Sequence, residues 1–277
     1  MQKENKSLAI INSTVAEIKL KPEFNSEMAD EGLFGMVVEV LEDLGQWKRI
    51  QTHYRYQGYI HKDDLVIDNN YAIYWKDNAQ AEVSHAVIDV MAAPKYQSYR
   101  LNVLTRGARI ISTGNTEEQW AEVVLPNDKK GWVRKDHLGS PVNLDIKKDD
   151  EEVIRQKLVK TAMFYLGTQY RWGGKSPLGI DCSGLCSVSY LLNGIIIYRD
   201  AHLKKEYMKE ISLEEIKPGD LLYFPGHVAM YIGDDKYIHS TSKSSGVVIN
   251  SLNPKDRDYR KDLRDDIIAI GTIFKGK

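Results

Sequence analysis

The sequence predicts an α+β protein in which two small β-barrels precede a domain that places helices before strands. Three observations support this fold class: a duplicated strand pattern before residue 140, a polar segment at 145–150, and helical periodicity after Glu151. A chain of 277 residues favours about two domains, and a single larger one or three small ones also fit this length.

An internal repeat determines the organisation of the first half. Residues 58–65 read GYIHKDDL, and residues 131–138, 73 positions later, read GWVRKDHL. Trp47 precedes the first of these segments by 11 positions, as Trp120 precedes the second. Short β-like runs alternate with turn residues in both copies, and neither copy has helical periodicity. The repeat therefore predicts two similar all-β domains.

These residues resemble bacterial SH3-like domains, whose last strands carry a tryptophan followed by a G-[WY]-[VI] pattern. The resemblance implies SH3-like barrels at residues 7–68 and 69–140. We interpret Trp47, Trp120 and Trp132 as core and turn residues rather than ligand contacts.

The second half begins after the charged segment 147–152, and its domain is predicted over residues 150–277. Ile154, Leu158 and Ala162 recur four positions apart, which predicts a helix ended by Gly167. The remaining predicted elements are a helix that begins at Cys182, a helical stretch from about Asp200 to Lys209, and a hairpin of strands 227–232 and 236–240.

Cys182 is the candidate nucleophile. Asp181 is the predicted N-cap of its helix, and Gly194 lies just past the end. A thiol in the first turn faces unpaired backbone N–H groups and the positive end of the helix dipole, which favour the reactive thiolate. Cys186, one turn later on an apolar face, is interpreted as a small buried hydrophobe.

Two histidines on the predicted hairpin supply the base and its orienting group. If the loop has three residues, Ala229 lies opposite His239, and His227 lies one diagonal step away on the same face. Cys182 would then attack an amide carbonyl while His227 takes its proton and His239 fixes the imidazole. The Cys182 N–H and the Tyr170 hydroxyl are candidate oxyanion donors.

A metal site is the competing chemistry, because cysteine and histidine both bind zinc. A structural zinc site needs four ligands, and neither a CxxC nor an HxxxH pattern occurs. We therefore predict no metal and no cofactor.

The second half closely resembles the NlpC-type cell-wall cysteine peptidases. The resemblance rests on five motifs in this order: Q-Y-R-W-G-G, D-C-S-G, P-G-D-L-x-[YF]-F, G-H-V-x-[ML]-Y-I-G and Y-I-H-S. The resemblance covers about residues 150–277 and implies a papain-like fold with Cys182, His227 and His239 as catalytic residues. With SH3-like domains in front, the chain is most similar to γ-D-glutamyl-L-diamino acid endopeptidases, which cut L-Ala-γ-D-Glu from diaminopimelate or lysine in murein peptides.

The resemblance also implies a set of substrate-binding residues. Glu27 and Tyr56, in the first SH3-like domain, match residues that bind a free N-terminal L-Ala. Tyr198 is a departure from the family pattern, because relatives often have proline at this position, on the Asp200 side of the pocket. The implied substrate-binding residues are Glu27, Tyr56, Tyr170, Trp172, Asp181, Ser183, Asp200 and Ala201.

Composition excludes several partner classes. A net charge of −1 gives no electrostatic attraction for nucleic acid, and no run approaches the ~18 apolar residues of a membrane span. The expected partners are murein stem peptides, and a monomer is expected. The compartment is cytoplasmic if Met1 is native, or periplasmic or cell envelope if a leader was removed. Two alternative functions are a non-catalytic cell-wall binding protein and a papain-like acyltransferase.

Overall fold

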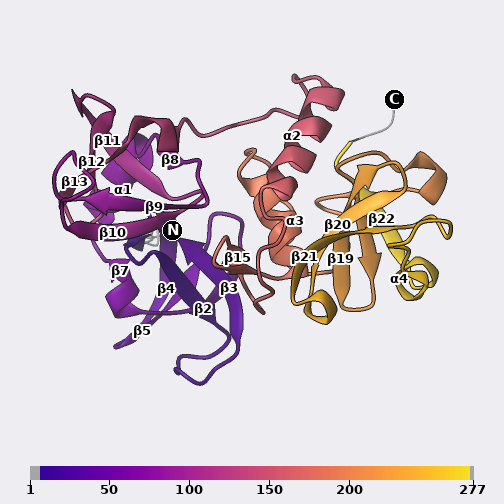
Figure 1. Ribbon diagram of the computed structural model, residues 1–277. Helices are drawn as coiled ribbons and strands as arrows, with labels where there is room; N and C mark the ends of the chain where they lie inside the picture. Colours follow the sequence, from indigo (N-terminus) through magenta and orange to yellow (C-terminus); the bar gives the residue numbers. More distant parts are fainter. Residues whose placement is uncertain (1–6, 275–277) are drawn as a thin grey trace. The chain divides into compact units, whose positions relative to one another are not determined.

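A computed structural model describes residues 7–274, and the chain divides after Pro141 into two compact units (Figure 1). Unit 1 comprises residues 1–141 and unit 2 residues 142–277. None of the helices within residues 7–274 is long and apolar enough to cross a membrane.

Unit 1 contains two seven-stranded antiparallel sheets with the same strand order, β3-β2-β6-β5-β4-β1-β7 and β10-β9-β13-β12-β11-β8-β14. Each strand of the first sheet corresponds to the strand seven places later in the second, so the sequence repeat is also a repeat of topology. The strands are β1 (Ser7–Ile11), β2 (Val15–Lys19), β3 (Met28–Leu33), β4 (Val37–Leu44), β5 (Trp47–Gln51), β6 (Gln57–His61), β7 (Leu65–Val66), β8 (Ala81–Val83), β9 (Val87–Met91), β10 (Arg100–Thr105), β11 (Arg109–Glu117), β12 (Trp120–Val124), β13 (Lys130–Arg134) and β14 (Leu138–Gly139).

The predicted closure of these sheets into barrels is not confirmed. The strand orders end at β3 and β7 in the first sheet and at β10 and β14 in the second, and neither order returns to its beginning over residues 7–274. The structure therefore shows two open, equivalent sheets rather than closed barrels.

The repeated residues serve packing in both copies. Trp47 and Trp120 are buried, and a Cβ added to Gly58 would lie 2.5 Å from the Ile18 side chain. A Cβ added to Gly131 would lie 2.4 Å from a methyl group of Val90, the residue that corresponds to Ile18. A larger side chain would overlap the neighbouring strand at either position, which explains why both copies have glycine there.

One helix of unit 1 was not predicted. Helix α1 (Asn69–Asn78) begins at Asp68, whose carboxylate accepts the Tyr71 N–H at 3.0 Å, and it packs on β1. Trp75 is fully buried and donates its indole N–H to the Gly35 carbonyl at 3.0 Å. The helix is short and weakly amphipathic, so its contacts with the first sheet stabilise it more than its own sequence does.

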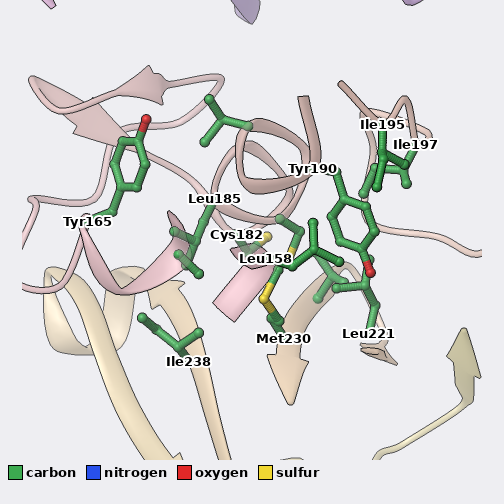
Figure 2. Close-up of a cluster of buried hydrophobic side chains, with 14 of the residues drawn as sticks. Leu158, Tyr165, Cys182, Leu185, Tyr190, Ile195, Ile197, Leu221, Met230 and Ile238 are labelled. Atoms are coloured by element: carbon green, nitrogen blue, oxygen red, sulfur yellow. The ribbon is translucent and has the colours of Figure 1, made fainter. Parts of the chain in front are cut away.

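Unit 2 packs two helices against one face of a six-stranded antiparallel sheet, with strand order β17-β22-β18-β19-β20-β21. Leu158 from α2, Leu185 from α3 and Met230 from the sheet meet in the buried cluster that Figure 2 shows. The elements are α2 (Glu151–Met163), β15 (Lys175–Ser176), β16 (Gly179–Ile180), α3 (Cys182–Leu191), β17 (Lys209–Glu210), β18 (Leu221–Phe224), β19 (His227–Gly233), β20 (Lys236–Thr241), β21 (Gly246–Ser251), α4 (Lys261–Asp265) and β22 (Ala269–Thr272).

The predicted helix from Asp200 to Lys209 is wrong. This segment consists of turns and bends, and β17 begins at Lys209. The ring of Tyr198 contacts His202 at 4.7 Å and Tyr207 at 6.2 Å between centroids, and the segment folds around it. Within this segment the Tyr207 and Met208 N–H groups donate to the Lys204 carbonyl at 3.0 and 3.1 Å, which forms a turn there rather than a continuous helix.

Candidate active site

Asp181 starts helix α3 and so positions Cys182. Its backbone is extended, and its carboxylate accepts the Gly184 N–H at 2.6 Å and the Gly173 N–H at 2.8 Å. These bonds fill donor sites that the helix leaves open and tie the first turn to the preceding loop. The N-cap predicted from the sequence is thus present.

Gly184 lets α3 approach that loop closely. A Cβ at this position would lie 2.0 Å from the Gly174 carbonyl oxygen and 3.0 Å from the Asp181 carboxylate. The helix therefore starts against backbone, with no space for a side chain between them.

Arg199 is a buried partner of Asp181 that we did not single out from the sequence. Its guanidinium lies 3.3 Å from Asp181 Oδ1 and donates to Ser183 Oγ at 2.7 Å and to the Gly173 carbonyl at 2.9 Å. Because both charges are buried, each needs the other to offset its loss of water. Arg199 directly precedes Asp200 and Ala201, two of the implied substrate-binding residues, and this position was the available signal for its role.

Cys182 is buried at the start of α3, within the cluster of Figure 2. The backbone N–H groups of Val228 and Ser183 hydrogen-bond to its sulfur, so the thiol lies beside the start of β19. Burial nevertheless raises the pKa of Cys182 to about 11, and the Asp181 carboxylate acts in the same direction. The backbone N–H groups lower the pKa of this thiol, as the helix start predicts, and burial acts more strongly in the opposite direction.

The two predicted histidines are neighbours. Met230 pairs with Ile238 between β19 and β20, so the next pair along is Ala229 with His239, as the hairpin predicts. His227 Nε2 lies 2.8 Å from His239 Nδ1. The imidazole of His239 is fully buried, whereas that of His227 is half-buried.

Asn250, on β21, completes the chain of hydrogen bonds and was missed from the sequence. Its Oδ1 lies 2.9 Å from His239 Nε2, and its Nδ2 donates to the Asp258 carbonyl at 2.9 Å. The alternation of residues along β21 was the available signal for Asn250. It could not be used, because the register between β20 and β21 depends on the turn 242–244 that joins them.

This chain sets the tautomers of both histidines. The Asp258 carbonyl can only accept, so Asn250 presents its amide nitrogen there and its oxygen to His239. His239 must then carry its proton on Nε2 and accept at Nδ1, and His227 donates from Nε2. In neutral His227 the lone pair is left on Nδ1, the form a general base needs.

Burial keeps both imidazoles uncharged. It lowers the pKa of His227 to about 3, with the neighbouring His239 adding to the effect. It lowers the pKa of His239 to about 4, although the hydrogen bond to Asn250 acts in the opposite direction. The resting site therefore holds a thiol and a neutral base rather than an ion pair.

The other predicted substrate-binding residues of unit 2 lie on the segments that frame Cys182. Burial raises the pKa of the half-buried Tyr170 to about 12, so its hydroxyl stays protonated and able to donate. Trp172 is 60% exposed, whereas Ser183 is buried at the start of α3. Asp200 is half-buried and hydrogen-bonds to the Tyr198 hydroxyl, and Ala201 packs against the core of unit 2.

Glu27 and Tyr56 belong to unit 1. Glu27 is exposed in the turn before β3, and the Tyr56 hydroxyl donates to the Ala29 carbonyl at 3.5 Å. The structure thus places the two side chains near the same strand, and their role in binding stays a prediction.

Comparison with known proteins gives the family. A model of the NlpC/P60 family matches residues 167–261, and a model of the bacterial dipeptidyl-peptidase Sh3 domain matches residues 21–65. A relative from Lysinibacillus sphaericus named "Dipeptidyl-peptidase 6" is 39% identical over 271 residues, which cover 96% of this chain and 99% of that protein. The chain belongs to the NlpC/P60 family. The resemblance found in its motifs is confirmed.

Two further comparisons agree with this membership. A "Gamma-D-glutamyl-L-lysine dipeptidyl-peptidase" from Bacillus cereus is 27% identical, covering 82% of this NlpC/P60 protein and 72% of the relative. A crystal structure of an NlpC/P60 family protein from Bacillus cereus matches with a TM-score of 0.78 at 21% identity, covering 95% of this chain and 98% of the other. At that identity, the structural match supports the fold alone.

Proposed function

We propose that this NlpC/P60 protein is a cysteine endopeptidase that hydrolyses the bond between γ-D-glutamate and the diamino acid of murein peptides, and releases L-Ala-γ-D-Glu. The observation that carries the proposal is the chain from His227 through His239 to Asn250, which leaves Nδ1 of His227 as a base. The 27% identity with a "Gamma-D-glutamyl-L-lysine dipeptidyl-peptidase" over 82% of this chain supports the choice of bond.

In the reaction, Cys182 attacks the γ-carbonyl carbon of D-glutamate as His227 takes the thiol proton at Nδ1. His227 then returns this proton to the departing amine, and water hydrolyses the thioester by the reverse proton transfers. His239 and Asn250 hold the His227 ring and its tautomer. The Cys182 N–H and the protonated Tyr170 hydroxyl stabilise the oxyanion.

The substrate contacts follow the family resemblance. We propose that Glu27 and Tyr56 bind the free L-Ala end and that unit 2 binds the D-glutamyl residue through Tyr170, Trp172, Asp181, Ser183, Asp200 and Ala201. We also propose that residues 7–68 and 69–140 are SH3-like domains, that residues 150–277 form a papain-like domain, and that the enzyme acts as a monomer on stem peptides.

Incubation with L-Ala-γ-D-Glu-meso-diaminopimelate, followed by mass analysis, tests the proposal. We expect equimolar L-Ala-γ-D-Glu and free diaminopimelate. A product joined to an added amine would instead indicate an acyltransferase, and an unchanged peptide would indicate a binding protein. The same incubation with the L-lysine peptide compares the two diamino acids.

A further inference from the structure

A cluster of charged side chains lies beside the histidines and has no part in the mechanism above. Arg260 precedes α4, and Lys243 lies in the turn Ser242–Ser244 that follows β20. Both contact Asp262: Arg260 Nε lies 2.8 Å from Oδ1 and Nη2 2.5 Å from Oδ2, and Lys243 Nζ lies 3.0 Å from Oδ2. Two cations thus share the Asp262 carboxylate, so these three side chains carry one surplus positive charge, whereas Asp256 and Asp258 pair with Lys236 instead.

The cluster is joined to the base by its backbone. Asn250, which orients His239, donates to the Asp258 carbonyl, and Tyr259 forms a β-bridge with Ser251. The segment that leads to Arg260 therefore runs along the end of β21. Lys243 comes two residues after the end of β20, the strand that carries His239. The same elements thus position the histidines and the cations.

The charges of this cluster affect the pKa values of the two histidines. After burial and His239, Arg260 and Lys243 are the next causes of the lowered pKa of His227. Arg260 also lowers the pKa of His239, against a smaller and opposite effect of Asp262. Arg260 therefore disfavours the charged form of both histidines, and Lys243 does the same for His227.

Both cations keep donors for a ligand. Arg260 turns Nε and Nη2 toward Asp262, so Nη1 points away from that carboxylate, and its side chain is 23% exposed. Lys243 is 69% exposed and contacts Asp262 with one of its three N–H donors. A guanidinium edge beside an ammonium suits a second carboxylate.

We propose that Arg260 and Lys243 form a subsite for a carboxylate of the leaving diamino acid. The proposal rests on the proposed function, in which His227 protonates the departing amine. That amine shares its carbon with the α-carboxylate, and diaminopimelate carries a second carboxylate at its far end, where lysine has only an ammonium. A subsite with one surplus positive charge attracts either carboxylate and disfavours the lysine ammonium.

Three peptides test the subsite: L-Ala-γ-D-Glu-diaminopimelate, its α-carboxamide and its side-chain carboxamide. Loss of one charged hydrogen bond to the substrate lowers kcat/KM by roughly ten- to a hundredfold. We expect the wild type to prefer the unmodified peptide over at least one amide by this factor, and the affected amide identifies the carboxylate that binds. In Arg260→Gln this preference falls to near one, and Arg260→Lys restores part of it.

Arg257→Gln is the matched control, because it removes an exposed positive charge from the same loop and should keep the wild-type preference. Lys243→Met should weaken the preference less than Arg260→Gln. Equal wild-type rates on all three peptides, or an Arg260→Gln variant slowed equally on all three, would overturn the subsite alone. Failure of the wild type to release L-Ala-γ-D-Glu from any of them would overturn the proposed function and the subsite with it.

Discussion

At the scale of single residues, Cys182 acquires its reactivity from a neighbour rather than from its place in the helix. Its thiol is buried and protonated, with a pKa of about 11. The neutral His227 beside the start of α3 can remove that proton in the step that forms the bond to carbon. Nucleophile and base therefore act together.

Substitution of the catalytic pair tests this dependence. We expect Cys182→Ala and His227→Ala to abolish release of L-Ala-γ-D-Glu, because no thiol or no base remains. His239→Ala should cause a large but incomplete loss, since an orienting residue transfers no proton to the substrate. Cys186→Ala is the control and should retain most of the activity. An active Cys182→Ala enzyme would contradict the mechanism.

The pH dependence of kcat/KM tests the state of the base. His227 must be neutral to accept the proton, and its lowered pKa of about 3 keeps it neutral in mild acid. We therefore expect the acid limb to lie below the ordinary imidazole value of about 6.5.

The variant Asn250→Asp supplies a matched comparison for this profile. A carboxylate beside His239 would favour the protonated histidines, so the acid limb should move to higher pH. A wild-type limb at or above the ordinary value, or no movement in the variant, would contradict the neutral resting pair.

At the scale of elements, the parts of the site set by local sequence could be predicted and the parts set by distant contacts could not. The start of α3 follows from Asp181, and the β19–β20 hairpin follows from its short turn. Asn250 could not be placed, because the register of β21 depends on the turn after β20, and the sequence does not define the length of that turn. Helix α1 was missed because its stability comes from packing on β1. The helix predicted after Asp200 is wrong because the segment forms turns, one of them closed by the Lys204 carbonyl, instead of a continuous helix.

Gly184→Ala tests the packing of α3. The added methyl group would overlap the Gly174 carbonyl, which is backbone and cannot rotate away. We expect a loss of about 1–3 kcal/mol in the free energy of unfolding, and a fall in kcat/KM because Cys182 moves with the helix. Denaturant titration and kinetics measure the two effects. Ser187→Ala, one turn later, should change both little, and a wild-type-like Gly184→Ala would mean that the contact is unimportant.

At the scale of the whole molecule, the duplication was predictable because it is written in matched spacings, and the structure repeats it as strand order. Whether the sheets close into barrels was not predictable, because closure depends on contacts between strands that are far apart in the sequence. The same limit applies to Glu27 and Tyr56, whose assignment to the substrate comes from the resemblance rather than from spacing. Their test must therefore be functional.

The variant Glu27→Gln provides a functional test of the role of Glu27. If the Glu27 carboxylate pairs with the ammonium of N-terminal L-Ala, the wild type should cleave L-Ala-γ-D-Glu-diaminopimelate roughly ten- to a hundredfold faster, in kcat/KM, than its N-acetyl form. The variant should lose most of this preference, whereas Glu23→Gln, an exposed neighbour in the same turn, should keep it. Equal wild-type rates on the two peptides would rule out the role of Glu27.

The buried, protonated thiol of Cys182 also bears on how this enzyme tolerates oxidants. Peroxides and disulfides attack thiolates, and a thiol that is 7% exposed with a pKa of about 11 offers them little thiolate and little access. The reactive sulfur exists mainly while a substrate is being attacked. We expect hydrogen peroxide to inactivate the free enzyme more slowly than it oxidises free cysteine at neutral pH. The enzyme would then remain active at oxidant concentrations that inactivate peptidases with a resting thiolate.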